Sequence, residues 1–207
     1  KRLQWCTEKK EKGEMFVDCL FTDECTVQAD PNKTLRMVTG PKDPKRLAPL
    51  PKHPVKLHVY GAISWRGASQ LFIFDSSERM DSNRFCEIYE ETVHTFGMKK
   101  YNGCYRLIQD NAPMHVSRFT KARFNQLGVT VMDWPAESPD INVIELVWAE
   151  LKAYVRNNCQ GHSLSDLTAS IHAFWGTLTK EKCRKYISHV HKAIDNVIEA
   201  KGGNFVE

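Results

Sequence analysis

The chain has 207 residues, 42% hydrophobic and 26% charged, which is ordinary for a globular domain with a substantial core. No apolar run approaches the ~20 residues of a membrane span and no signal peptide is visible, so no membrane partner is expected. The net charge of +4 permits nucleic-acid binding without requiring it. Seven cysteines without a Cys-x-x-Cys pair favour reduced thiols in the cytosol or nucleus over disulfides or a zinc site.

The start of the chain predicts a helix and then two strands. Residues 1–13 are charged, with Trp5 as the side chain expected to anchor them on the core. An apolar run from Met15 ends on Asp23 and predicts the first strand. The alternation from Cys25 to Ala29 is typical of a half-buried hairpin partner.

A basic, proline-rich stretch follows. Residues 31–54 hold six prolines, which argue against regular structure over most of the stretch. From 33 to 56 there are seven Lys or Arg residues and one acid. The stretch is either a solvated surface loop or an extended arm that contacts DNA phosphates or a second subunit. On the second interpretation the candidate contacts are Lys42, Lys45 and Arg46.

The middle of the chain predicts a hairpin and an amphipathic helix. Two apolar runs within residues 55–75 predict the hairpin, whose second strand ends at Asp75. Residues 81–97 carry apolar side chains at helical spacing, and Gly97 is the expected stop signal.

A second buried strand is expected just before Asp110, because a short apolar run ends abruptly at this carboxylate. Asn and Pro then turn the chain into a helix with Val116 and Phe119 on its apolar face, closed by Gly128. Another strand is expected over 129–132.

The last third of the chain is predicted to be helical. Residues 138–140 carry small polar caps and a proline, which predict a helix start. Glu145 lies at the margin of the apolar stripe of this helix, and Lys152 and Arg156 follow on the same row. Two more helices are expected in 160–207.

Three of these acids suit a two-metal site. Asp23 and Asp110 end predicted strands and Glu145 lies on a helix margin. Carboxylates so placed hold a pair of hard divalent cations about 3.5–4 Å apart. The alternatives are that Glu145 is an ordinary solvated helical residue and that Asp75 is a rival ligand.

Three strings together resemble the DDE transposases of the mariner superfamily. They are Thr22-Asp23-Glu24, then Gln-Asp-Asn-Ala-Pro-Met-His from 109 to 115, and Trp-Pro-x-x-Ser-Pro-Asp from 134 to 140. The 34 residues between Asp110 and Glu145 match the branch whose third acid is Glu. The resemblance covers about residues 5–155. Val143 and Leu146 depart from it, because the family usually has Pro and often Asn there.

The resemblance implies an α/β, RNase H-like fold, in which helices flank a central mixed sheet and a basic Pro-rich insertion separates early strands. Residues 1–207 are expected to form one catalytic domain, with 160–207 as its C-terminal helices. The stretch 31–54 resembles the family's clamp on a partner subunit, so a homodimer is expected. Any DNA-binding helix-turn-helix is expected upstream of Lys1.

The implied function is that of a nuclear DNA transposase, an endonuclease that cleaves and joins strands by phosphoryl transfer. Two Mg²⁺ ions, or Mn²⁺ as a substitute, would be held by Asp23, Asp110 and Glu145. The further candidate contacts to DNA are His115, Lys152 and Arg156. One alternative is a domesticated, non-cleaving DNA-binding or scaffold protein, to which the departures beside Glu145 point. A nuclease acting on RNA is compatible with the acids alone.

Overall fold

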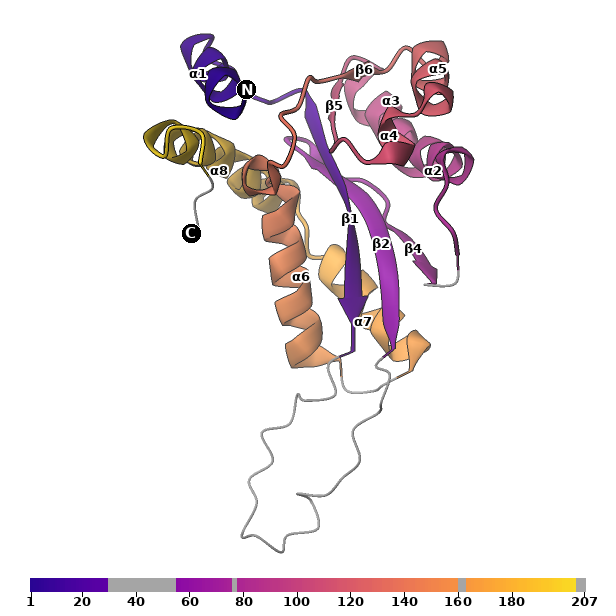
Figure 1. Ribbon diagram of the computed structural model, residues 1–207. Helices are drawn as coiled ribbons and strands as arrows, with labels where there is room; N and C mark the ends of the chain where they lie inside the picture. The colour runs from indigo at the N-terminus through magenta and orange to yellow at the C-terminus, as the bar shows by residue number, and fades with distance from the viewer. Residues whose placement is uncertain (30–54, 76–77, 160–162, 204–207) are drawn as a thin grey trace, which may run out of the picture.

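The computed structural model describes residues 1–29, 55–75, 78–159 and 163–203. Its centre is a six-stranded mixed sheet (Figure 1). The strands are β1 (Cys19–Gln28), β2 (Lys56–Ser64), β3 (Gly67–Ala68), β4 (Phe72–Asp75), β5 (Arg106–Ile108) and β6 (Thr130–Val131). β1 pairs antiparallel with β2 and parallel with β5, and β6 extends the parallel side. β3 and β4 both pair with β2.

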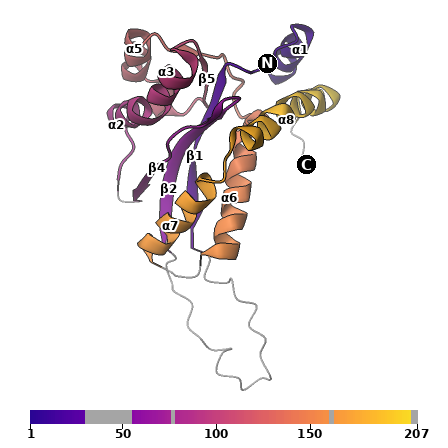
Figure 2. The same ribbon diagram turned by 180° about the vertical axis from the view of Figure 1, so that it is seen from behind.

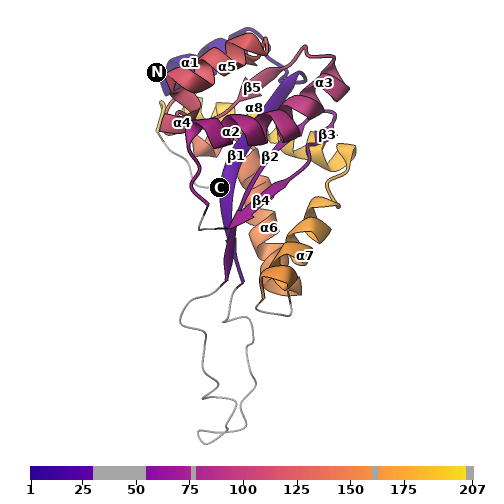
Figure 3. The same ribbon diagram turned by 90° about the vertical axis from the view of Figure 1, so that its right-hand side faces the viewer.

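Helices cover both faces of the sheet. Figures 1 and 3 show α2 to α5 on one side and α6 to α8 on the other, so the expected architecture of a mixed sheet flanked by helices is confirmed. The helices are α1 (Arg2–Glu11), α2 (Ser82–Tyr89), α3 (Thr95–Tyr101), α4 (Pro113–Val116), α5 (Arg118–Gln126), α6 (Ile144–Asn158), α7 (Leu164–Trp175) and α8 (Lys180–Glu199). None of those in the described residues is long and apolar enough to cross a membrane.

The alternation of side chains along β1 produces two hydrophobic cores. Phe21 and Cys25 belong to the core shared with α6, α7 and α8. Leu20, on the opposite face, packs with Leu107 and Phe85 in the core under α2 and α5. Because successive strand residues point to opposite faces, Asp23 is directed toward α6 and Glu24 toward α4.

Asp23 does not end a strand, and this expectation is wrong. Residues 19–28 form one continuous strand, so the predicted break into two strands is absent. The ladder with β2 runs through Asp23, which lies opposite Gly61, and continues to Gln28 opposite Lys56. Pairing with a neighbouring strand therefore keeps the acidic pair Asp23 and Glu24 extended.

The predicted helix over 81–97 is confirmed at its start but runs further. Asp81 caps it by accepting from two backbone N–H groups. A π-helical turn at Glu90–His94 joins α2 to α3, which ends at Tyr101. Gly97 lies inside α3, where a Cβ would come within 2.3 Å of the Tyr105 ring. This glycine serves close packing and not termination.

Two other helix predictions need correction. The helix carrying Glu145 begins at Ile144, after a separate 3₁₀ turn at Pro139–Ile141, because Asn142 is extended (φ −78°, ψ 100°). The helix predicted to run to Gly128 is divided into α4 and α5. Val116 and Phe119, expected in its core face, are 38% and 50% exposed.

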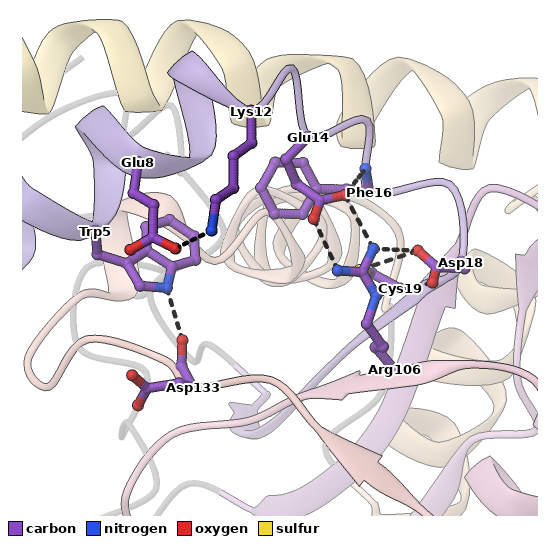
Figure 4. Close-up of polar contacts among 9 residues, drawn as sticks. All are labelled: Trp5, Glu8, Lys12, Glu14, Phe16, Asp18, Cys19, Arg106 and Asp133. Atoms are coloured by element: carbon purple, nitrogen blue, oxygen red, sulfur yellow. Dashed lines mark hydrogen bonds and ion pairs between the residues drawn. The ribbon is translucent and has the colours of Figure 1, made fainter.

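Polar contacts tie α1 and the segment after it to the sheet. Figure 4 shows the Trp5 indole N–H donating to the carbonyl of Asp133, 2.6 Å away. It also shows the Arg106 guanidinium donating to Glu14 (Nη1–Oε2 2.7 Å) and to Asp18 (Nε–Oδ2 2.8 Å). The hydrogen bond from Arg106 lowers the pKa of Glu14 to about 2. These contacts fix the start of β5 to the segment between α1 and β1, and they fix Asp133, just after β6, to α1.

Candidate active site

Asp23, Asp110 and Glu145 line one cavity of about 430 Å³. Asp23 comes from the middle of β1, and Asp110 follows the end of β5. Glu145 lies in the first turn of α6. Residues 134–139 complete the wall above them. The predicted proximity of the three segments is therefore found, although 86 residues separate the first two acids along the chain.

Asp23 is the most perturbed of these acids. Burial raises its pKa to about 8, with further contributions from the negative charges of Glu145 and Glu24. The indole N–H of the fully buried Trp148 donates to its Oδ2 atom at 3.2 Å. This carboxyl group is consequently fixed in place and, near neutral pH, retains a proton in the absence of a neighbouring cation.

Asp110 belongs to a second polar network on the other side of β1. His115 donates from Nδ1 to Asp110 Oδ1 (2.6 Å) and from Nε2 to Glu24 Oε1 (3.1 Å). Burial lowers the pKa of His115, but its hydrogen bonds to the two carboxylates outweigh this effect and raise the pKa to about 9. The same contact from His115 lowers the pKa of Asp110. The positive charge of the His115 imidazolium therefore balances the negative charge of Asp110 and not that of Asp23.

The three acids share a cavity without being gathered around one point. In the part of the chain that the structure describes, no three His, Cys, Asp or Glu side chains lie close enough together to hold a metal ion. The expected convergence within metal-bridging distance is thus not met. The donor set nevertheless fits hard divalent cations, because all its donors are oxygens and a bound cation would stabilise the ionised form of Asp23.

Other predicted site residues lie elsewhere. Lys152 and Arg156 are on the exposed face of α6, beyond the cavity, and Lys152 adjoins the Cys25 thiol. Asp75 ends β4, as expected, and does not line the acid cavity.

The expectation that His115 contacts DNA needs correction. Its side chain is 2% exposed and both ring nitrogens are already bonded to carboxylates. It supports the site from behind and cannot reach a phosphate in this arrangement. The predicted contacts Lys42, Lys45 and Arg46 lie outside the described residues, as does the stretch 31–54.

Sequence reasoning missed the partners of the acids. Trp148 falls in the apolar stripe of the predicted helix, which indicates burial and no polar role, and Glu24 stands out only as part of the Thr22-Asp23-Glu24 string. Glu24 and His115 are 91 residues apart along the chain, so no local pattern links them. For Trp148 the available signal was its position one helical turn after Glu145, on the side of α6 that faces β1.

The family assignment follows from the comparison of the sequence with family models. The model described as DDE superfamily endonuclease matches residues 18–168, well over half of the chain. The chain belongs to this family.

Two curated relatives are transposases. The chain is 25% identical to the transposable element Tcb2 transposase of Caenorhabditis briggsae, over 97% of this chain and 75% of that protein. It is 27% identical to the Tc1 transposase of Caenorhabditis elegans, over 84% of this chain and 63% of that protein. The chain is therefore similar to Tc1-type transposases over part of their length.

Solved structures of the Mos1 mariner transposase share the fold. The paired end complex with Mn superposes with a TM-score of 0.81 at 14% identity, covering 99% of this chain and 62% of that chain. The Mos1 catalytic domain gives 0.74 at 13% identity, covering 99% and 94%. The predicted RNase H-like fold is confirmed by this likeness.

Proposed function

We propose that this chain is the catalytic part of a Tc1/mariner-like transposase that cleaves DNA strands and transfers their ends. The observation that carries the proposal is the cavity shared by Asp23, Asp110 and Glu145 within the fold of this family. The proposed branch is the one in which a Glu follows the second Asp after 34 residues, as Glu145 does here.

The proposed cofactors are two Mg²⁺ ions, with Mn²⁺ as a substitute. Structures of the Mos1 relative contain Mn or Mg, which supports the choice of metal. Asp23, Asp110 and Glu145 would hold the ions, and Trp148 would keep the Asp23 carboxylate oriented. Bound Mg²⁺ would lower the pKa of an attacking water or 3′-hydroxyl and stabilise the leaving oxygen. Asp110 would have to exchange at least part of its contact with His115 for a metal contact.

The proposed partner is DNA, since the Mos1 relative is seen in paired-end complexes with a transposon end. Lys152 and Arg156 would hold backbone phosphates, which provides affinity without sequence choice. We further propose that residues 1–207 form a single domain. We also propose that the protein is a homodimer in which 31–54 contacts the second subunit. Finally, we propose a nuclear location, where a transposase would meet chromosomal DNA.

Asp110→Asn tests the catalytic assignment. The variant loses a ligand charge at constant size, so we expect Mg²⁺-dependent nicking of supercoiled DNA to fall by at least 100-fold, on the order of one lost metal ligand or charge-stabilising group. The matched control is Asp75→Asn, which neutralises a strand-end acid outside the cavity and should nick at the parental rate. Nicking at the parental rate by Asp110→Asn would show that the site is elsewhere.

One observation favours a second candidate, a domesticated DNA-binding protein without cleavage. The Asp110 carboxylate is directed to His115, and the acids are not gathered in the described residues as a ready metal site. Val143, one of the two departures from the family pattern, is buried in the core two residues before Glu145. It leaves the proposed metal ligand Glu145 in place. A parent protein that binds DNA but shows no nicking with either Mg²⁺ or Mn²⁺ would establish this candidate.

A further inference from the structure

The three acids lie on backbone segments that are joined by uncharged hydrogen bonds. The parallel ladder between β1 and β5 extends to Phe21 opposite Ile108. At the next residue, the Thr22 hydroxyl donates to the carbonyl of Ile108 at 2.8 Å. Thr22 immediately precedes Asp23, and Ile108 lies two residues before Asp110. This one hydroxyl therefore adds a side-chain tie between the segment of the first acid and that of the second.

The same threonine is tied to the segment of the third acid. The Asn142 side chain donates from Nδ2 to the carbonyl of Thr22 at 3.2 Å. The carbonyl of Asn142 accepts from the backbone N–H of Glu145 at 3.0 Å, at the start of α6. Asn142 is extended between the 3₁₀ turn and α6, so its amide fixes the point at which the helix carrying Glu145 begins.

Both residues are buried, since Thr22 is 1% exposed and Asn142 is 6% exposed. Their contacts join positions 86 and 120 residues apart along the chain. Among the residues that the structure describes, the buried Oδ1 atom of Asn142 has no hydrogen-bond partner. A buried unpaired oxygen costs free energy, so this amide is poorly explained by stability alone. The hydrogen bond from its Nδ2 atom to Thr22 is better explained by a need to hold the two backbone segments at a fixed spacing.

We propose that Thr22 and Asn142 are positioning residues, forming a hydrogen-bonded brace that sets the spacing of the segments bearing Asp23, Asp110 and Glu145. The inference rests on the proposed function, because it assigns those acids to metal binding. Groups that orient metal ligands from behind typically contribute 10–100-fold to metal affinity. The brace acts on the backbone segments and does not itself contact the carboxylates, whose orientation depends on other partners such as Trp148 and His115.

Thr22→Val and Thr22→Ser separate the hydroxyl from the rest of the side chain. Isothermal titration with Mn²⁺ alone, on the whole chain, gives the metal affinity without an activity assay. We expect Thr22→Val to weaken Mn²⁺ binding by about tenfold or more, and Thr22→Ser to stay within about threefold of the parent. Thr92→Val is the matched control, because Thr92 is similarly buried and its hydroxyl donates to the carbonyl of Ile88, one turn earlier in the same helical run.

The control distinguishes positioning from a general structural role. A purely structural role predicts that Thr22→Val and Thr92→Val lower the melting temperature alike and leave Mn²⁺ affinity unchanged, and this result would overturn the brace. Asn142→Ala provides a second route if Thr22→Val does not fold. It should weaken Mn²⁺ binding and speed hydrogen exchange at the Glu145 amide, and parental values for both would overturn the proposal.

Failure of the brace and failure of the proposed function give different results. If the parent binds Mn²⁺ no better than Asp23→Asn, the metal site itself is wrong and the brace falls with it. If the parent binds Mn²⁺ through Asp23 but Thr22→Val binds equally well, only the brace is wrong.

Discussion

Asp23→Asn should make the metal-free protein more stable, and the gain should grow with pH. Asp23 has a pKa of about 8 in the fold against an ordinary value of 3.8, because it is buried and faces Glu145 and Glu24. The folded chain thus holds this proton more tightly than the unfolded chain. The contribution to stability is complete below about pH 4 and is lost as the pH rises toward about 8. Asparagine has no proton to lose and avoids this loss.

The size of the effect follows from the linkage of protonation to folding. One pKa unit corresponds to about 1.4 kcal/mol, so the full shift would exceed 5 kcal/mol. Water in the open cavity and local relaxation reduce this figure, and we expect a gain of about 2 kcal/mol at pH 8.5. For a chain of this length such a gain raises the melting temperature by about 4–8 °C.

Thermal unfolding in EDTA at pH 5 and pH 8.5 measures the gain. The matched control is Asp133→Asn, the same chemical change at an exposed aspartate that does not line the acid cavity. Adding MgCl₂ at pH 8.5 should stabilise the parent and not Asp23→Asn, which removes most of the difference. The reasoning would be refuted if Asp23→Asn were less stable than the parent at pH 8.5, or if its gain in melting temperature over the parent were the same at both pH values.

Two further predictions concern packing and the basic stretch. Gly97→Ala should destabilise the fold by about 1–3 kcal/mol in urea denaturation, because the added Cβ meets the Tyr105 ring at 2.3 Å; a more stable variant would mean that the helix preference of Ala prevails. Changing Lys42, Lys45 and Arg46 together to Ala should weaken DNA binding and flatten its salt dependence at a nearly unchanged melting temperature. An unaltered salt slope with unaltered sedimentation would leave the stretch as a plain surface loop.

Elements set by local signals could be predicted from the sequence. The strand before Asp110 was predicted because an apolar run stops at a turn signal, and the structure ends β5 at Ile108. The cap at Asp81 follows from the same local chemistry. The predictions from the sequence are wrong where residues distant along the chain determine the local structure. β1 continues past Asp23 because β2 pairs with it, and Gly97 stays helical because the Tyr105 ring packs against it.

The three acids of the candidate site could be predicted from the sequence, whereas the residues that surround and contact them could not. Residue type and motif order were enough to select Asp23, Asp110 and Glu145. The position of the His115 imidazolium between two carboxylates depends on α4 lying against the face of the sheet to which Glu24 points, which spacing along the chain cannot show. For the same reason the different protonation of Asp23 and Asp110 became apparent only from the three-dimensional arrangement.

The packing of α1 on α8 has a consequence for the choice of expression boundaries. The family match covers residues 18–168, whereas α1 precedes it and α8 follows it. Both helices contribute to the hydrophobic core that contains Phe21 and Trp134, and Figure 2 shows them side by side. A protein trimmed to the family match would present this apolar surface to water and would be prone to aggregate. Recombinant versions should therefore retain both flanking helices.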